Sequence, residues 1–459
     1  MLNTVRGMVS LVMLERKEKV KTVSNGVLLV LGSDYCTLQV VKEAKAMGYY
    51  VIVADLMEKS PTKEAADEAW LISTTDIDLL IDKCKKHSIK GIMFGASDFN
   101  INNARIICKK LNLSIYCSDD YAWKVARDKR EFKNLCKYVG APIADDYELD
   151  DYLNDDSINK IKFPVVVKPS DKSGNRGMSY CNNKQELIEA YQNVREISDA
   201  SVIIERKLVG QEYNVHYAIA EGVPRLLYFS STHHEPGQAE NLYSFKCTTS
   251  AYLKQYIEEV NDKAVEVIKK SGCKEGIAWF DCIRDNDGHF YLLEMGHRFG
   301  GVMTYVPYEK VSGFNTTKWM IECAVGVRHT VADLPKELNE AYKGCAGSYH
   351  LFSNSEDVIV SIKGLDNLSK VENIFIDLPK REGNSLRYHA CSGLIGIYGK
   401  DVYDLCDKLR RINELLFIKN SNGSNMFIKF DDYEGLIKEY NKGLRQFLKD
   451  DTRAKNDNL

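Results

Sequence analysis

The sequence predicts a mixed fold in which a doubly wound α/β unit comes first and α+β regions follow it. Residues 27–31 form a continuous apolar run, which is typical of a parallel strand buried on both faces of its sheet. Strand-like and helix-like segments then alternate as far as about residue 118, as in doubly wound folds. From Phe163 onward the pattern changes to strands joined by glycine turns, and this change favours an α+β arrangement.

Local signals give the order of the elements. In the first part of the chain we predict strands at 27–31, 49–54 and 91–94, and helices from the Gly32 turn to Gly48, near 76–87, and at 123–140. In the later part we predict a helix at 184–196 with a capping box of Asn183 and Glu186, strands at 202–206 and 213–220, a helix at 252–271, a hairpin at 277–295, and a last region of about 340–450 with several strands and a helix at 401–416.

Composition argues against several classes of protein. The net charge of -3 gives no basis for a nucleic-acid partner. The thirteen cysteines include no Cys-x-x-Cys pair, which argues against a structural zinc site or a disulfide framework and favours free thiols in a reducing cytoplasm. No apolar run is long enough to cross a membrane, and no Gly-x-Gly-x-x-Gly motif follows the first strand. Residues 1–25 are expected to be a loosely attached extension, and residues 451–459 a frayed polar tail.

The hairpin at 277–295 carries the most informative pair of residues. Its Asp287-Gly288 dipeptide is a strong signal for a two-residue turn, and that turn places Asp281 directly opposite Glu294. Their Cβ atoms are then about 5 Å apart, and like charges at that distance repel by about 3 kcal/mol at an effective dielectric constant near 20. A divalent cation with oxygen ligands offsets this repulsion, whereas two solvated carboxylates are the alternative. Apolar neighbours on the same face favour the cation.

Arg298 follows this carboxylate pair and precedes Gly300 and Gly301. A guanidinium in this position can contact a transferring phosphoryl group or a substrate carboxylate. An isolated arginine is more often a surface charge, but its place beside a candidate metal site favours the functional interpretation.

Two segments upstream have features of a nucleotide site. A strand at 163–168 ends in Lys168, and the loop 170–178 holds small residues whose backbone N–H groups can approach phosphate oxygens. This loop is not a Walker A motif, and by itself it also fits an ordinary hairpin loop. The strand at 202–206 runs into a linker up to Glu212, where open backbone groups suit an adenine edge and a carboxylate suits ribose hydroxyls.

In this order the motifs resemble those of the ATP-grasp superfamily, from about residue 26 to residue 447. The resemblance rests on the α/β unit, the helix with Asp128-Lys129, the strand ending in Lys168, the glycine loop, the 205–208 linker and the acidic hairpin. It implies a doubly wound pre-ATP-grasp domain at 26–122, an ATP-grasp domain at 123–335 with a mobile lid at about 145–207, and a C-terminal α+β domain at 336–450.

The resemblance also implies roles for particular residues. The ATP-binding set that it implies is Lys129, Lys168, Ser173, Gly174, Gly177, Met178, Glu205, Arg206, Lys207, Leu208, Glu212 and Leu293. Asp281 and Glu294 are expected to bind Mg²⁺, for which Mn²⁺ can substitute, and Arg298 is expected to act in catalysis on the acyl-phosphate side. Many relatives have asparagine two residues after the second carboxylate, whereas this chain has Gly296, so the number of bound Mg²⁺ ions, one or two, stays open.

The activity that the resemblance implies is phosphorylation of a carboxylate, followed by displacement of the phosphate by an amine. Residues 385–399 resemble the C-terminal domain of biotin carboxylases and amino-acid ligases. The chain has no Met-Lys-Met biotinylation motif and one copy of the unit that carbamoyl-phosphate synthetases carry twice, so single-copy carboxylate–amine ligases are the better likeness. Two alternatives remain, an enzyme that activates bicarbonate and a non-catalytic ATP-binding module.

The expected substrates are a small carboxylic acid, for which an amino acid is the leading candidate, and an amine. The candidate substrate contacts are His233, His234, His297, Gly300 and Gly301, although histidines in polar loops are usually solvated. A homodimer is implied by analogy with relatives, and neither a nucleic acid nor a membrane is an expected partner.

Overall fold

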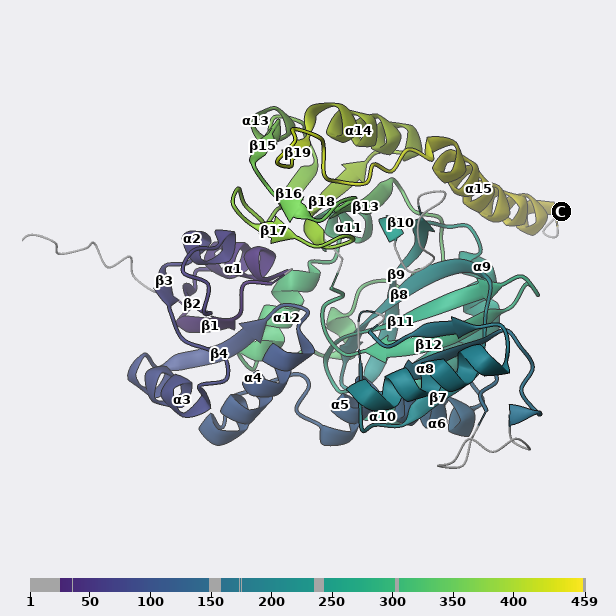
Figure 1. The fold of residues 1–459 in the computed structure, drawn as a ribbon, viewed down its shortest axis with the longest axis horizontal. Coiled ribbons are helices and arrows are strands. Elements are labelled where there is room, and N and C mark those ends of the chain that lie inside the picture. Colours follow the sequence, from purple (N-terminus) through teal and green to yellow (C-terminus); the bar gives the residue numbers. More distant parts are fainter. Residues whose placement is uncertain are drawn as a thin grey trace, which may run out of the picture.

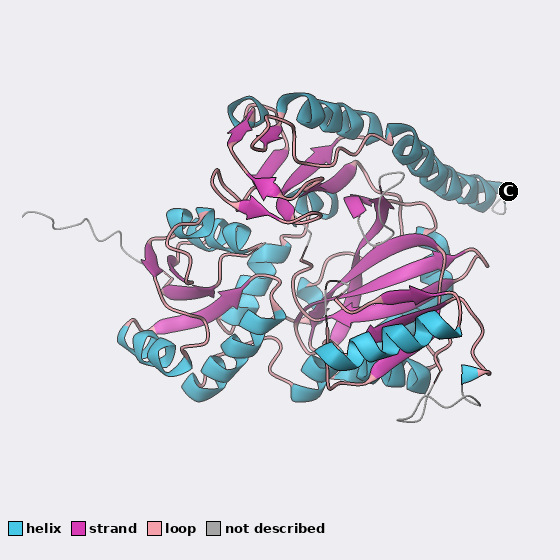
Figure 2. Cartoon of the chain, viewed as in Figure 1, coloured by secondary structure: helices cyan, strands magenta, loops and turns pink. Residues whose placement is uncertain are grey.

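The computed structural model describes residues 25–34, 36–147, 158–172, 174, 176–234, 243–301 and 305–456, with side chains described as far as residue 447 (Figure 1). Ser173 and nearly all of the predicted N-terminal extension lie outside these residues. Figure 2 shows that helices and strands are mixed along the whole described chain. None of the helices in this part of the chain combines the length and apolar character needed to cross a membrane.

The first unit is a parallel sheet of four strands in the order β3-β2-β1-β4. Its strands are β1 (Val27–Leu31), β2 (Tyr50–Ala54), β3 (Glu68–Trp70) and β4 (Ile89–Phe94), and its helices are α1 (Thr37–Ala46), α2 (Pro61–Ala65), α3 (Ile77–Lys86) and α4 (Asp98–Leu111). The apolar run of β1 is almost completely buried, as its sequence predicts, because β1 lies between β2 and β4 and helices cover the sheet. The short strand β3 was not predicted.

The predicted single helix at 123–140 is wrong, because the chain forms two helices here. They are α5 (Asp120–Val125) and α6 (Lys129–Val139). Asp128 interrupts the run, since its backbone is extended and its carboxylate accepts hydrogen bonds from the N–H groups of Arg130 and Glu131. The predicted end at Gly140 is confirmed, where a φ of 68° suits glycine.

A small antiparallel sheet follows, in the order β6-β5-β7. It consists of β5 (Val165–Pro169), β6 (Ser179–Cys181) and β7 (Val202–Arg206), and α8 (Lys184–Ile197) covers one face of it. Asn183 caps α8 as predicted by accepting from the Glu186 N–H. The Glu186 carboxylate accepts from the backbone N–H of Asn182 at 2.7 Å, one residue earlier than a capping box requires.

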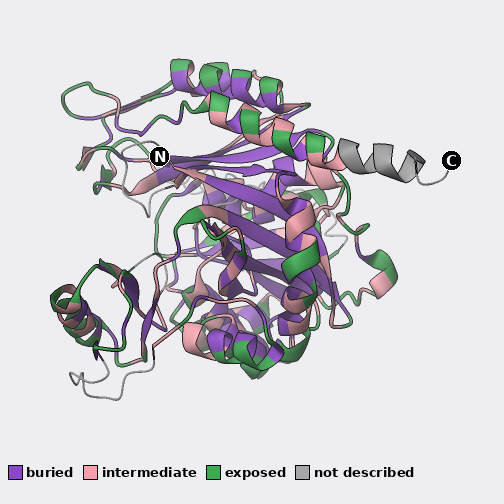
Figure 3. Cartoon of the chain, turned by 90° about the vertical axis from the view of Figure 1, so that its right-hand side faces the viewer, coloured by how far each residue is buried: buried purple, intermediate pink, exposed green. Residues whose placement is uncertain are grey.

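The largest sheet has eight strands in the order β12-β11-β8-β9-β10-β13-β18-β16. They are β8 (Gly210–Ala220), β9 (Val223–His234), β10 (Tyr243–Thr248), β11 (Gly276–Asp285), β12 (Phe290–Gly296), β13 (Cys345–Phe352), β16 (Ile374–Asp377) and β18 (Cys391–Gly399). The last three come from the C-terminal region, so one hydrogen-bonded sheet runs continuously across residue 336. Figure 3 shows that its strands are largely buried, while the helices expose their outer faces.

The remaining helices complete the fold. They are α9 (Leu253–Tyr256), η1 (Ile257–Asn261), α10 (Asp262–Ser271), α11 (Tyr305–Ser312), α12 (Thr316–Ala324), η2 (Val331–Asp333), α13 (Leu365–Leu368), α14 (Val402–Leu415) and α15 (Tyr433–Asn456). Two short strand pairs accompany them, β14 (Asp357–Val358) with β17 (Ser385–Leu386), and β15 (Ser361–Lys363) with β19 (Phe417–Lys419). The predicted helix at 252–271 contains a π-helical segment, η1, in its middle. The backbone of α15 continues to Asn456, where a frayed tail was expected.

Candidate functional site

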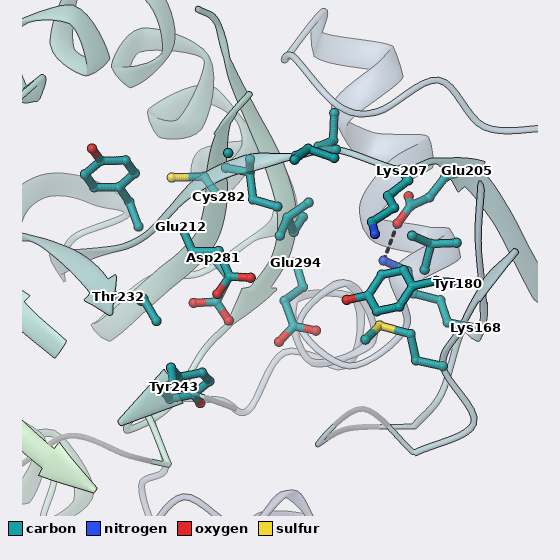
Figure 4. Close-up of a pocket in the computed structure, with 18 of the residues that line it drawn as sticks. Lys168, Tyr180, Glu205, Lys207, Glu212, Thr232, Tyr243, Asp281, Cys282 and Glu294 are labelled. Carbon is teal, nitrogen blue, oxygen red and sulfur yellow. Dashed lines mark ion pairs between the residues drawn. The ribbon is translucent and has the colours of Figure 1, made fainter. Parts of the chain in front are cut away.

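A cavity of about 630 Å³ opens beside the edge of the eight-stranded sheet, facing the small sheet of β5, β6 and β7 (Figure 4). It brings together residues that are far apart in the sequence. The predicted site residues that line it are Lys129, Lys168, Gly174, Met178, Glu205, Arg206, Lys207, Leu208, Glu212, His234, Asp281, Leu293 and Glu294.

Six predicted residues do not line this cavity. Gly177 packs against Ile197 and Pro169, and Gly301 lies near Ala96. His233 is partly buried and hydrogen-bonds with Ser231 at 2.8 Å. The others are His297, Arg298 and Gly300.

His297 has a structural environment. The side chain is 1% exposed, and its Nε2 lies 3.0 Å from the Glu275 carbonyl oxygen. Burial lowers the pKa of His297 to about 4, so the imidazole is neutral at physiological pH. These contacts support a packing role and give no opening toward a substrate.

The hairpin of β11 and β12 pairs Asp281 with Glu294, as predicted, but by a different route. The Asp285 N–H donates to the His289 carbonyl, so the turn has the three residues Asn286–Gly288 and not the predicted two. Gly288 takes a φ of 91°, the left-handed residue that such turns need. Next to the turn, the strand pairing is therefore offset by one residue from the predicted register. A second shift must restore the predicted register before Asp281 and Glu294 are reached.

The second shift is a β-bulge at Leu293. Cys282 lies opposite Leu292, whereas the next residue, Asp281, lies opposite Glu294, which leaves Leu293 as the extra residue. Successive side chains of a regular strand point to opposite faces. At this bulge Leu293 and Glu294 both line the cavity, which places an apolar side chain directly beside a carboxylate.

Three of the four carboxylates that line the cavity are those of Glu212, Asp281 and Glu294 (Figure 4). Burial raises the pKa of Asp281, and the charge of Glu294 raises it further. Burial also raises the pKa of Glu212, with a contribution from Asp281. Asn214 donates to Asp281 Oδ1 at 2.6 Å, and Lys246 opposes the rise in the pKa of both Asp281 and Glu212.

This donor set fits a hard divalent cation. Carboxylate oxygens are the ligands that Mg²⁺ prefers, and the repulsion between Asp281 and Glu294 is the cost that a cation removes. In the described part of the chain no three His, Cys, Asp or Glu side chains are grouped closely enough to hold a metal by themselves. Mg²⁺ sites for nucleotides are commonly built in this way, from one or two carboxylates with substrate phosphates completing the coordination.

Lysines supply the opposing charge. The Lys129 ammonium lies 3.1 Å from Glu294 Oε2 and donates to the Lys172 carbonyl at 2.7 Å. Burial would raise the pKa of Glu294, but Lys129 lowers it overall, so this carboxylate stays ionised. Lys129 therefore connects the acidic hairpin to the predicted phosphate loop.

A second ion cluster surrounds Glu205, whose side chain is 5% exposed. Its carboxylate pairs with Lys168 and, at 2.8 Å, with Lys133. Burial opposes ionisation, but the two ammonium groups lower the pKa of Glu205 to about 2. Lys133 was not among the predicted site residues, although it lies one helical turn after Lys129 on the same face of α6.

The linker after β7 leaves one backbone donor open. The N–H groups of Arg206 and Lys207 bond to the carbonyls of Asp145 and Pro164, and that of Val209 bonds to Asp285. Within the described residues the Leu208 N–H has no protein acceptor, and Leu208 lines the cavity.

Trp279 explains the glycine at position 296. The two residues lie opposite each other on β11 and β12, and a Cβ atom on Gly296 would lie 2.2 Å from the indole ring. The indole N–H donates to the Arg298 carbonyl at 2.9 Å, and the guanidinium lies over the ring at 5.1 Å. Asp98 completes the setting, 2.6 Å from Arg298 Nε. Trp279 thus occupies the space of a longer side chain and fixes Arg298.

Comparison with known proteins identifies the class. Residues 161–306 match the family model of the ATP-grasp domain, so the chain contains a domain of this family. The carbamoyl phosphate synthase large chain of Clostridium beijerinckii is 23% identical over 325 residues, which is 65% of this chain and 29% of the relative. The chain thus covers less than two thirds of that relative's length.

Two solved structures are similar over nearly the whole chain. Biotin carboxylase from Campylobacter jejuni has a TM-score of 0.72 at 17% identity, covering 92% of this chain and 97% of its own. An L-amino acid ligase from Bacillus licheniformis has a TM-score of 0.70 at 16% identity, covering 87% of this chain and 99% of its own. At these identities the likeness concerns the fold, which is a mixed α/β ATP-grasp fold.

The fit of Trp279 against Gly296 can be tested by adding one methyl group. We expect Gly296→Ala to lower the free energy of unfolding by about 1–3 kcal/mol, because the new Cβ overlaps the indole ring. Gly301→Ala is the matched control, since its new Cβ would lie 3.6 Å from Ala96, an ordinary contact. Urea unfolding measures both. Equal stability of the two variants would contradict this explanation of Gly296.

The Glu205 cluster predicts an acid dependence of stability. The pKa of Glu205 is about 2 in the folded state and near 4.5 in the unfolded state. The contribution of this carboxylate to the free energy of unfolding is therefore complete above pH 5 and is lost as the pH falls toward 2. This contribution to the free energy of unfolding is about 3 kcal/mol. We expect Glu205→Gln to flatten this part of the stability–pH profile and to lower stability at pH 7 by about 3–5 kcal/mol, since two buried lysines lose their partner. The exposed Glu196→Gln should leave the profile unchanged, and an unchanged profile in Glu205→Gln would refute the assignment.

Proposed function

We propose that this protein is an ATP-dependent ligase that phosphorylates a small carboxylic acid and couples the resulting acyl phosphate to an amine, with release of ADP and phosphate. One observation carries the proposal. A single cavity beside the ATP-grasp domain's hairpin is lined by Lys129 and Lys168 and by the opposed carboxylates Asp281 and Glu294. Phosphoryl transfer requires positive charges that bind the phosphates and oxygen atoms that hold a metal ion.

The cavity suggests how ATP binds. The open N–H of Leu208 suits an acceptor nitrogen on the adenine edge, and Met178 and Leu293 provide apolar contact for the ring. Glu212 is our candidate for the ribose hydroxyls, although its place beside Asp281 also suits a role near the cation. Lys129 and Lys168 are our candidates for the phosphates, a role in which their partners Glu294 and Glu205 hold them in position.

Asp281 and Glu294 are the proposed Mg²⁺ ligands. When bound, Mg²⁺ neutralises phosphate charge during transfer. The clash of any Cβ at Gly296 with Trp279 removes a side-chain ligand from that position, and Asn214, bonded to Asp281, is the nearest amide on the neighbouring strand β8. The proposal includes Mn²⁺ as a substitute for Mg²⁺, and it allows either one or two bound ions.

The chemistry follows from positioning and charge. The carboxylate substrate attacks the γ-phosphorus of ATP, the bond to the β-phosphate oxygen breaks, and ADP leaves. The amine then attacks the acyl carbon and phosphate departs, after the amine has lost a proton. We assign Arg298 to the negative charge of the acyl phosphate, since Asp98 and Trp279 hold its guanidinium in place.

The relatives support this class and also supply its rival. The L-amino acid ligase has nearly the same extent as this chain, and so has biotin carboxylase, with an equally similar fold. Activation of bicarbonate is therefore the second candidate. The two lysines and two carboxylates in one cavity argue against a non-catalytic ATP-binding module.

Further parts of the proposal concern organisation. We propose domains at 26–122, 123–335 and 336–450, with a lid at about 145–207 that contains β5, β6 and β7. A cytoplasmic location is favoured by the thirteen cysteines, none of which forms a disulfide. A homodimer is proposed by analogy alone.

The decisive experiment is a screen of amino acids, singly and in pairs, for ADP release. We expect ADP to appear only when both an acid and an amine are present, because the acyl phosphate turns over only when an amine removes it. Coupled detection of ADP gives the rate, and mass spectrometry identifies the amide. Full turnover with bicarbonate alone would contradict the ligase proposal.

The metal assignment has its own test. We expect Glu294→Gln to reduce kcat by about 100-fold or more, since removal of one preorganised charge contact typically costs that much. Its melting temperature should stay near that of the wild type, as should that of the control Glu266→Gln, a partly exposed position on α10 that should also keep its activity. Wild-type turnover in Glu294→Gln, or turnover unaffected by EDTA, would refute the role of this carboxylate.

A further inference from the structure

A second cavity, of about 330 Å³, lies where the first unit meets the far edge of the eight-stranded sheet. Its walls come from α1, from α11 and the start of α12, and from the edge strand β16. It shares no lining residue with the nucleotide cavity. The walls are tied together, since Gln39 on α1 accepts a hydrogen bond from the Tyr305 N–H at the start of α11.

Two residues that line this cavity have a buried polar atom without a hydrogen-bond partner among the described residues, Gln39 at Nε2 and Asp377 at Oδ2. Asp377, at the end of β16, is 5% exposed, and the Cys36 backbone N–H donates to its carboxylate. Its Oδ2 atom has no hydrogen-bond partner among the described residues. Burial raises the pKa of Asp377 to about 6, against the pull of Lys42, so the group is still mainly ionised at pH 7. A buried carboxylate oxygen without a donor is costly, and a ligand that donates to it would remove the cost.

Two more carboxylates face the same space. Asn315 donates to Glu43 at 3.0 Å and also hydrogen-bonds to Glu309, so the two acids lie close together. Burial raises the pKa of Glu309, and the charge of Glu43 adds to the rise. With Asp377 this makes three acidic groups against one base, Lys42, which is exposed at the rim. The charge balance calls for a cation.

The rest of the wall is apolar. Leu38, Val306, Ile374, Phe375 and Ile376 supply it. A hydrated metal ion gains no free energy from contact with an apolar surface, whereas an organic cation buries its hydrocarbon part against it.

We propose that the cavity between α1, α11 and β16 binds a small primary amine in its ammonium form, with the ammonium donating to Asp377 Oδ2 and an apolar stem packed along β16. The ammonium provides the donors that this oxygen lacks and balances part of the acidic charge. The site does not depend on the ligase proposal, since its geometry involves none of the nucleotide-binding residues.

The site is also connected to the candidate catalytic arginine. Cys36 donates its N–H to Asp377 and its thiol to the Gly300 carbonyl, with Sγ 3.5 Å from that oxygen. Gly300 follows Arg298 by two residues, and its N–H donates to the Tyr305 hydroxyl at 2.7 Å. Cys36 thus links an amine bound at Asp377 to the Gly300 backbone, two residues after Arg298.

The test is calorimetric titration of the full-length protein, without ATP, with isopentylamine and with 4-methylpentanoate. These probes share a branched apolar stem and differ in the sign of the charged group. We expect isopentylamine to bind, 4-methylpentanoate not to bind, and Asp377→Asn to weaken isopentylamine binding at least tenfold. Glu372→Gln, which removes an exposed carboxylate just before β16, is the matched control and should bind like the wild type.

Absence of isopentylamine binding, equal affinity in Asp377→Asn, or preferential binding of the carboxylate would each overturn the proposal. If Asp377→Asn fails to fold, Glu309→Gln replaces it, with an expected loss of several-fold. Unchanged ATP affinity in these variants shows that the nucleotide site is intact. Competition between isopentylamine and the amine of the ligase reaction would make the occupant a substrate, whereas binding of both together would make it a separate ligand, and either result keeps the site.

Discussion

The candidate site depends on a repulsion. Asp281 and Glu294 face each other across an antiparallel pair, in a wall where partial burial reduces the screening by water. Two such charges are stable together only if cations are near. Much of the surrounding structure provides them: Lys129 reaches Glu294 directly, and Lys246 opposes the rise in the pKa of Asp281. The opposed carboxylates remain a repulsive pair within this network, and a divalent cation would relieve that repulsion.

The lysines need the same kind of support. A lone buried ammonium is as costly as a lone carboxylate, and Glu205 resolves this for Lys168 and Lys133 at once. The result is an alternation of charges from α6 through β7 to the hairpin, in which each group is held by a neighbour of opposite sign. Such a network fixes side chains before a ligand arrives, which is how electrostatic catalysis avoids reorganisation.

Much of this could be predicted from the sequence, because it depends on local patterns. The buried run of β1 follows from its apolar pattern. The pairing of Asp281 with Glu294 was predicted from a two-residue turn, whereas the structure reaches it through a three-residue turn and a bulge. What could not be predicted depends on contacts distant in sequence. Lys133 has a role only because β7 brings Glu205 to it, and the match of Gly296 to Trp279 requires the strand pairing. The continuity of the large sheet across residue 336 likewise depends on strand order, which no local signal gives.

The bulge at Leu293 has a consequence for how this hairpin tolerates change. A regular ladder with a two-residue turn and the observed ladder, with a three-residue turn and one extra residue, both bring Asp281 opposite Glu294. The acidic pair is therefore indifferent to the length of the turn, provided that the strand absorbs the difference. The position of the apolar neighbour does depend on the length of the turn, since only the bulged strand turns Leu293 into the cavity. Within one hairpin, the opposed carboxylates are thus buffered against insertions and deletions in the turn, while the apolar surface beside them is free to diverge.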